Sequence, residues 1–228
     1  MRDFLEGGIK ATQQEYFEAQ LVQPQRELLE GLTAPSAIQA FLDSIPYAPE
    51  DRNRCPLNVL RDRRAHCLDG ALFAAMALRR IGQPPVIIDL LPEPGTDDDH
   101  VLAIYKRDGH FGALAKSNYV GLRFRETVYR TLRELVMSYF EVFYNIHGIK
   151  TLRSYTPPLN LHTFDPLHWM WDDAGADAIE ACLKTLRQIS VVTPSMVKCL
   201  LPVDTRSYEA GMLGADSDGL YVPQGDTP

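Results

Sequence analysis

Two residues of this chain could form a thiolate–imidazolium pair. Cys67 stands where a polar segment ends and a helical apolar pattern begins, so its sulfur would lie near unpaired N–H groups at the positive end of a helix dipole. His100 begins a later predicted strand, after an intervening helix, strand and loop. A thiol at a helix start and a histidine on a following strand are the partners that nucleophilic thiol catalysis requires.

A third group must orient the imidazole, and the hairpin register limits the choice. Two apolar runs flank Asp108 and Gly109, a dipeptide typical of two-residue hairpin turns. An unbroken hairpin places Ser117 opposite His100, whereas one extra residue, in a bulge or a wider loop, places Asn118 there. We predict Asn118, because its amide oxygen can accept from the ring N–H and fix the tautomer. Ser117 remains the alternative.

Several elements would position these residues. The segment CLDGALFAAMALRRIG has an apolar stripe of helical spacing, and Gly82 and Pro84 end the helix. VIIDLL (86–91) predicts a buried strand, and the hairpin follows it. Further apolar stripes predict helices in 35–46, 126–145 and 176–189, and a helical region over 9–32 with a break near Pro24.

These elements predict a single α+β domain over residues 1–228. The helix that carries Cys67 would pack on a small antiparallel sheet, within a core of about residues 55–125. Extra helices would lie on both sides of this core, in an N-terminal region (1–45) and a C-terminal region (126–190). The tail (205–228) has little to bury, and we expect it to be flexible.

Composition excludes several classes of protein. The chain has 228 residues, of which 45% are hydrophobic, so it can bury a core. Its net charge of −7 argues against binding to nucleic acid or to anionic membranes. No apolar run is long enough to span a bilayer, and the start, MRDFLEGGIK, lacks the apolar centre of a signal peptide. We therefore expect a cytoplasmic protein.

The other cysteines are not expected to carry chemistry. Four cysteines are too sparse for a disulfide framework, and none forms a CxxC pair. Cys55 lies in a charged loop and is predicted to be a surface or half-buried thiol, whereas Cys182 and Cys199 have apolar neighbours and are predicted to be core residues. His66 directly precedes Cys67 and is expected to point elsewhere.

Metal sites and cofactors are not expected either. A zinc set of Cys55, His66, Cys67 and His100 would lack the short paired spacing of structural zinc sites. The acidic run 97–99 lacks the glycine-punctuated spacing of a calcium loop and is predicted to be a solvated loop. Its charges would raise the pKa of His100 and favour the ion pair.

The segments RRAHCLDGALFAAMALRRIGQPPVIIDL, DDDHVLAIYKRDG and ALAKSNYVG together resemble the Cys, His, Asp/Asn core of the transglutaminase-like superfamily of papain-like thiol enzymes, in a bacterial branch. The resemblance covers about residues 55–125, a third of the chain. It implies that Cys67 is the nucleophile, that His100 is the base, and that Asn118 stands where such enzymes carry Asp or Asn. The tryptophan-rich strand of many members is present only as HFGALA.

This resemblance implies acyl transfer on a peptide or protein amide or isopeptide, by hydrolysis or transamidation. The first alternative is a catalytically idle module on the same scaffold that binds a peptide or another partner. The second is an acyltransferase similar to the arylamine N-acetyltransferases, because CLDGALFAAMALRRIG also resembles their cysteine helix. The rest of that family's longer chain is not evident.

Overall fold

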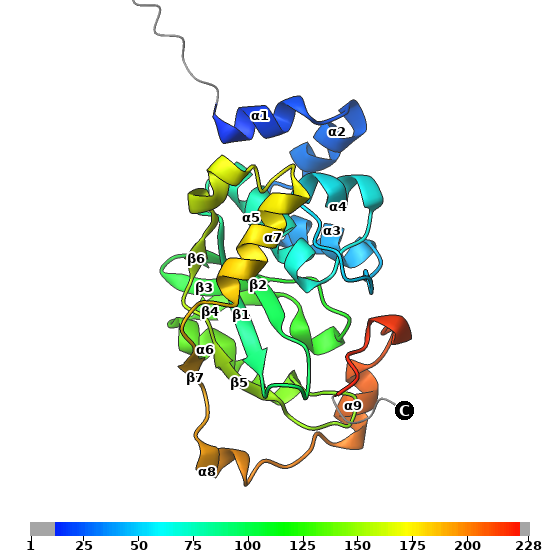
Figure 1. The fold of residues 1–228 in the computed structure, drawn as a ribbon, viewed down its shortest axis with the longest axis vertical. Helices are drawn as coiled ribbons and strands as arrows, with labels where there is room; N and C mark the ends of the chain where they lie inside the picture. The colour runs from blue at the N-terminus through cyan, green and yellow to red at the C-terminus, as the bar shows by residue number, and fades with distance from the viewer. Residues whose placement is uncertain (1–11, 224–228) are drawn as a thin grey trace, which may run out of the picture.

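A computed structural model describes residues 12–223, and five helices occupy its amino-terminal part (Figure 1). The helical region predicted over 9–32 is confirmed within the described residues as two helices, with Pro24 in the first turn of the second. The predicted helix in 35–46 is also confirmed. The five are α1 (Gln13–Ala19), α2 (Gln23–Gly31), α3 (Pro35–Ser44), α4 (Pro56–Asp62) and α5 (Cys67–Arg80).

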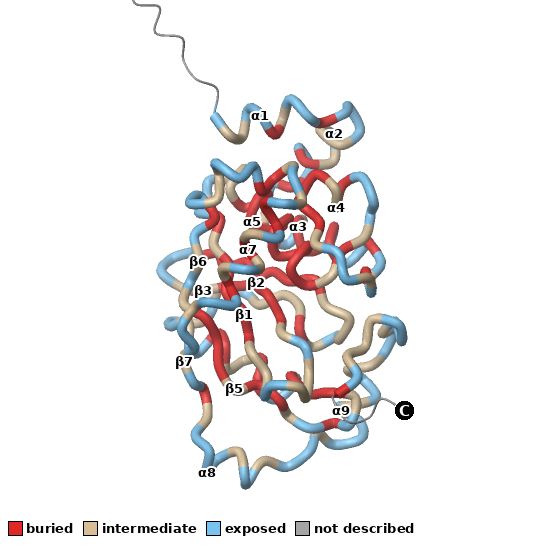
Figure 2. Tube along the Cα trace, in the orientation of Figure 1, coloured by how far each residue is buried: buried red, intermediate tan, exposed pale blue. Residues whose placement is uncertain are grey.

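Helix α5 is the centre of the fold. It begins at Cys67 as predicted, its last turn carries Arg79 and Arg80, and it is followed by Gly82 at a φ of +84°. Every residue from Cys67 to Leu78 is buried, so the helix has no solvent face over that length. Figure 2 shows the same concentration of buried residues in α5 and in the neighbouring strands.

Seven strands form one antiparallel sheet in the described part of the chain, in the order β4-β3-β2-β1-β5-β7 with β6 paired to β1. The predicted strand 86–91 and the predicted two-residue turn are confirmed, since Asp108 and Gly109 both have positive φ and Arg107 pairs with His110. The strands are β1 (Val86–Pro92), β2 (His100–Arg107), β3 (His110–Leu114), β4 (Arg125–Tyr129), β5 (Leu152–Tyr155), β6 (Leu159–Asn160) and β7 (Ile189–Ser190).

The two faces of the sheet bury different clusters. On β2, Val101, Ala103 and Tyr105 pack with α5 and the other amino-terminal helices. Leu102 and Ile104 pack on the other face, against residues of α6 (Leu132–Met137) and the 3-10 helix η2 (Phe140–Val142). This alternation is the period of two expected of a strand buried on both faces. The predicted α+β class, with the cysteine helix packed on an antiparallel sheet and extra helices around it, is confirmed.

The predicted long helix over 126–145 is wrong. Residues Arg125–Tyr129 form β4, whose residues alternate in burial and pair with β3. The β-branched Thr127 and Val128 favour this extended form, and the side chain of Thr131 then caps the short α6. The apolar stripe that suggested one helix is real, but it is divided between α6 and η2.

The carboxyl-terminal part of the chain lies first near one end of the sheet and then near the other (Figure 1). The helix predicted in 176–189 is confirmed in its first half as α7 (Asp173–Leu183), with the 3-10 helix η3 (Leu161–Leu167) before it. Two short helices, α8 (Pro194–Val197) and α9 (Thr205–Gly211), precede the 3-10 helix η4 (Ser217–Gly219). The tail predicted to be flexible thus contains a helix that packs on Tyr144, and only 224–228 lie outside the described residues.

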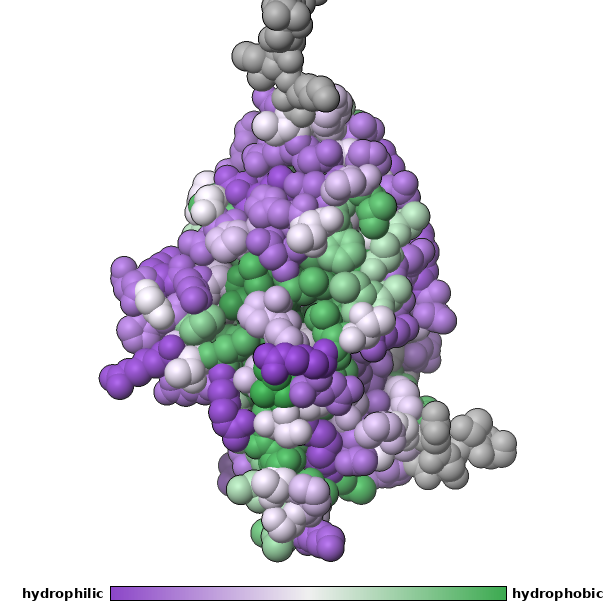
Figure 3. Space-filling view, turned by 60° about the vertical axis from the view of Figure 1, so that its left-hand side comes forward, coloured by the Kyte–Doolittle hydropathy of each residue, from purple (hydrophilic) through white to green (hydrophobic). Residues whose placement is uncertain are grey.

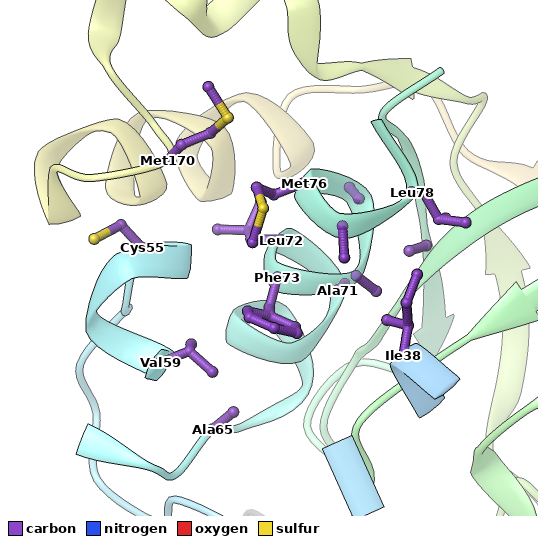
Figure 4. Packing of buried hydrophobic residues seen from close by; sticks show 14 of the residues in the cluster. Ile38, Cys55, Val59, Ala65, Ala71, Leu72, Phe73, Met76, Leu78 and Met170 are labelled. Atoms are coloured by element: carbon purple, nitrogen blue, oxygen red, sulfur yellow. The ribbon is translucent and has the colours of Figure 1, made fainter. Parts of the chain in front are cut away.

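The four cysteines, all within residues 12–223, are free thiols. Cys55 is fully buried between α4 and the segment of Met170 (Figure 4), so the surface prediction for it is wrong. Cys199 is exposed, which contradicts the core prediction, and Cys182 is half-buried. The charged segment around Cys55 is held in the core because the Cys55 N–H donates to the carboxylate of Asp173.

The surface is mixed in polarity. Figure 3 shows an apolar area, interrupted by hydrophilic groups, on the face turned toward the viewer. Strand β4 lies at one edge of the sheet and leaves Val128 64% exposed. Among the described residues, no helix has the length and apolar character required to cross a membrane.

Candidate functional site

A cavity of about 270 Å³ opens at the amino end of α5. The cavity is lined by the loop after α3, the start of α5, neighbouring parts of β1 and β2, α7, and the segment after α9. Its lining residues that carry charge or chemistry are Tyr47, Glu50, Asp51, His66, Cys67, Asp89, Asp98, Asp99, Glu180, Lys184, Asp218 and Tyr221.

Cys67 lies in this cavity in a surrounding that disfavours the thiolate. Its side chain is buried, with 7% exposure, and Sγ–H donates to the carbonyl oxygen of Asp99 at 3.8 Å. Burial raises the pKa of the Cys67 thiol well above its ordinary value, and the charges of Asp99 and Asp98 raise it further. The helix start and the Val101 N–H act in the opposite direction but do not outweigh burial. The surroundings of Cys67 therefore favour the neutral thiol.

Asp89 and Asp99 line the same cavity as Cys67. Asp89 stands on β1 opposite Val101, on the face of the sheet that packs against α5, and it is only 2% exposed. The carboxyl groups of Asp89 and Asp99 influence each other's pKa. Burial and the charge of Asp99 raise the pKa of Asp89 well above its usual range, and burial together with Asp98 raises the pKa of Asp99 to about 6. The two groups can therefore hold one proton between them.

His100 lies on the opposite face of the sheet from Cys67. It pairs with Leu90, and both residues have the orientation of Leu102, which belongs to the cluster away from α5. The ring Nε2–H donates to the carbonyl oxygen of Leu122 at 2.7 Å. Burial lowers the pKa of His100 to about 4, so the acidic run before it does not raise that pKa as the sequence predicts. No hydrogen bond joins His100 to Cys67 in residues 12–223.

Asn118 and Ser117 lie near His100 but bond elsewhere. The three residues line a second cavity of about 40 Å³, which adjoins the first at Tyr47 and Asp99. The Asn118 side chain accepts from the N–H of Asp216 and donates to its carbonyl oxygen, each at 2.8 Å. Ser117 Oγ accepts from the N–H of Tyr119. The structure therefore brings His100 and Asn118 to one cavity without an orienting hydrogen bond between them.

The hairpin register favours neither residue by direct pairing. The β2–β3 ladder is unbroken from the turn to the pair Ala103 and Leu114, where β3 ends. The extra residue that would set Asn118 opposite His100 is absent from this paired part. The catalytic roles of Cys67, His100 and Asn118 stay predictions.

His66 lines the cavity together with Cys67. The sequence predicts instead that His66 points elsewhere. Its Nε2 lies 3.1 Å from Oδ1 of Asp69 and 3.1 Å from the carbonyl oxygen of Arg52. Asp69 is fully buried and also accepts from the N–H of Arg54. The spacing of His66 and Asp69 at the start of a helix, three residues apart, is the signal that could have revealed this pair.

No family model matches the chain, and no curated protein matches it. Among solved structures, LapG of Legionella pneumophila in its EGTA-treated form is similar at a TM-score of 0.36 and 13% identity, over 50% of this chain and 72% of that one. A second structure of the same protein matches at a TM-score of 0.34 and 14% identity, over 46% of this chain and 68% of that one. Within residues 12–223, no group of three or more His, Cys, Asp or Glu side chains is arranged to hold a metal ion.

Proposed function

We propose that this chain is a binding module on a transglutaminase-like scaffold, and that the Cys67 cavity holds part of a peptide or protein partner without thiol catalysis. One observation carries the proposal: Cys67 Sγ–H donates to the backbone carbonyl oxygen of Asp99, in a cavity lined by Asp89, Asp98 and Asp99, and His100 does not line that cavity. Acyl transfer requires a thiolate and a proton donor for the leaving amine. Neighbouring carboxylates oppose the first requirement, and His100, bonded to Leu122 on the other face, does not meet the second.

The size of the cavity suits part of a partner rather than a complete small-molecule ligand. Cavities for complete small-molecule ligands are commonly about 300–1,000 Å³. At about 270 Å³, this one lies just below that range. It has room for one long side chain of a partner.

The test compares Cys67 with Cys199 in the same molecule, since Cys199 is an exposed thiol away from the cavity. The intact protein is alkylated with iodoacetamide from pH 5 to pH 10, and labelling of each cysteine is quantified by mass spectrometry. We expect the midpoint for Cys67 to lie above that for Cys199, because burial and negative charge hold the proton on the sulfur. A midpoint for Cys67 below that of Cys199, abolished by His100→Gln, would instead establish the Cys67–His100 pair.

A second candidate is the thiol acyl-transfer enzyme itself. The observation that favours it is that Cys67 heads α5 in an open cavity also lined by His66, which Asp69 orients. In that reaction the sulfur attacks an amide carbonyl and its proton passes to His66, which then protonates the leaving amine; water or a second amine resolves the thioester. A low labelling midpoint for Cys67 that is lost in His66→Gln but kept in His100→Gln would support this candidate.

A further inference from the structure

We infer that the group bound in the Cys67 cavity is a cation at the end of an aliphatic chain, the lysine or arginine side chain of a basic peptide segment. This inference rests on the proposed function, since it names the ligand class of the same cavity. It depends on the charges in the lining, on one buried carboxylate oxygen, and on the apolar groups beside them.

The acidic lining residues outnumber the cations that could neutralise them. The two cationic candidates in the lining are already engaged: Lys184 pairs with Glu180 at 2.6 Å, and His66 pairs with Asp69. Glu50 is likewise paired, with Arg54 and Arg64. Five lining carboxyl groups form no ion pair within residues 12–223, namely Asp51, Asp89, Asp98, Asp99 and Asp218. Even with one proton held between Asp89 and Asp99, the open volume has a negative potential.

Asp89 provides an observation independent of this charge count. Its side chain is buried and lines the cavity, and its Oδ1 has no hydrogen-bond partner. Buried carboxylate oxygens in proteins are nearly always paired, because an unpaired one loses its hydration without compensation. Asp99 adds like charge beside Asp89 and supplies no cation. A ligand cation would supply the partner that this chain does not.

The remaining lining suits an organic cation better than a metal ion. The acidic side chains are not grouped for metal coordination in the described residues. Val101, Leu183 and Leu220 offer apolar contact for an alkyl stem, and Tyr47 and Tyr221 offer aromatic rings. Cations attached to alkyl chains bind such surroundings through both the charge and the stem.

The test uses Nα-acetyl-lysine-N-methylamide as probe and the intact chain labelled with 15N. We expect concentration-dependent NMR shifts at Asp89, Asp99 and Val101, and no matching binding of the norleucine analogue, which has the stem but no charge. Asp98→Asn should weaken the probe about tenfold. Asp89→Asn should do the same, and Glu209→Gln, which removes an exposed carboxylate outside the cavity, should leave the Kd unchanged.

Three results would overturn the inference: equal binding of the norleucine analogue, equal weakening in Glu209→Gln, or absence of shifts at the cavity. Displacement of the probe by calcium at lower concentration than the probe's own Kd would identify a metal site instead. Asp98 is exposed, so its variant keeps the test valid even where Asp89→Asn fails to fold. The proposed function fails separately, through a low labelling midpoint for Cys67, whichever way the lysine probe behaves.

Discussion

Gly70 of α5 lies directly against Lys116, so that a Cβ built on Gly70 would stand 2.3 Å from the Cβ of Lys116. Lys116 is itself buried, and its Nζ donates to the carbonyl oxygens of Leu42 and Ile45 at the end of α3. Three parts of the fold therefore meet at one glycine, one turn after Cys67. The lack of a side chain at Gly70 lets the chain after β3 approach the helix that carries the thiol.

Gly70→Ala should destabilise the protein by about 1–3 kcal/mol, because neither the Lys116 backbone nor its Cβ can retreat without moving the chain after β3. The measurement is urea unfolding followed by circular dichroism. Gly31→Ala is the matched control, since nothing lies within 4 Å of its Cβ and alanine favours helix by up to about 1 kcal/mol. Equal effects of the two substitutions would show that the close approach at Gly70 is not constraining.

His100 should make the fold sensitive to acid. Burial holds its folded-state pKa at about 4, below the ordinary 6.5, so the unfolded chain binds a proton here before the folded chain does. Stability is therefore lost as pH falls from about 6.5 to about 4, by up to about 3 kcal/mol. The difference in unfolding free energy between wild type and His100→Gln, measured from pH 4 to pH 8, isolates this contribution. A difference that does not vary with pH would contradict the buried neutral imidazole.

The effect of Asp99 on the stability of the fold should depend on pH in the opposite direction to that of His100. The folded-state pKa of Asp99 is raised to about 6, so ionisation costs stability above that pH and costs nothing below about 4. Asp99→Asn should be more stable than wild type at pH 8 by about 1–2 kcal/mol, allowing for its partial exposure, and equally stable near pH 4. Asp204→Asn provides the contrast, because its pKa is lowered by bonds to Ser207 and the substitution should weaken the fold slightly at pH 8. A less stable Asp99→Asn at pH 8 would refute the cost of ionising Asp99 through burial and the charge of Asp98.

Much of the fold could be predicted from local signals in the sequence. The helix over 67–80, the strand after it and the Asp108-Gly109 turn each have a pattern that depends on neighbours in the chain, and all three were confirmed. The helix predicted over 126–145 is wrong because its first four residues, 126–129, belong to β4, which pairs with β3, a contact that periodicity does not reveal. The predicted burial of Cys55 and of Cys199 is wrong for the same reason, because long-range packing decides which thiol is buried.

Whether two predicted site residues meet depends on which face of the sheet each of them lies on. The order of Cys67 and His100 along the chain is compatible with a pair on one face, yet the pairing of His100 with Leu90 turns its ring to the other. One position in register exchanges the faces of a strand, and so Asp99, not His100, stands beside the thiol. His66 was overlooked because adjacency to Cys67 suggested that it points away, whereas its bond to Asp69 holds it at the cavity.

Asn118 connects the chain after β3 to the segment after α9. Its amide bonds the backbone of Asp216 in both directions, and Gly219 packs so closely that a Cβ there would lie 2.7 Å from the Tyr47 ring and 3.1 Å from Asn118 Nδ2. The residues that follow, up to Tyr221, line the Cys67 cavity. Asn118 thus helps to hold one wall of the cavity in place.

Asn118→Ala should therefore speed alkylation of Cys67 about two- to tenfold at pH 8, because loss of the two hydrogen bonds lets the segment Ser217–Gly219 open more often. Hydrogen exchange in that segment should accelerate in parallel. Ser117→Ala is the matched control, since Ser117 Oγ bonds only locally to Tyr119 and its loss leaves the Asp216 contact intact. Slower labelling of Cys67 in Asn118→Ala, with unchanged exchange at Ser217–Gly219, would mean that Asn118 supports the reactivity of the thiol and would restore its predicted place beside His100.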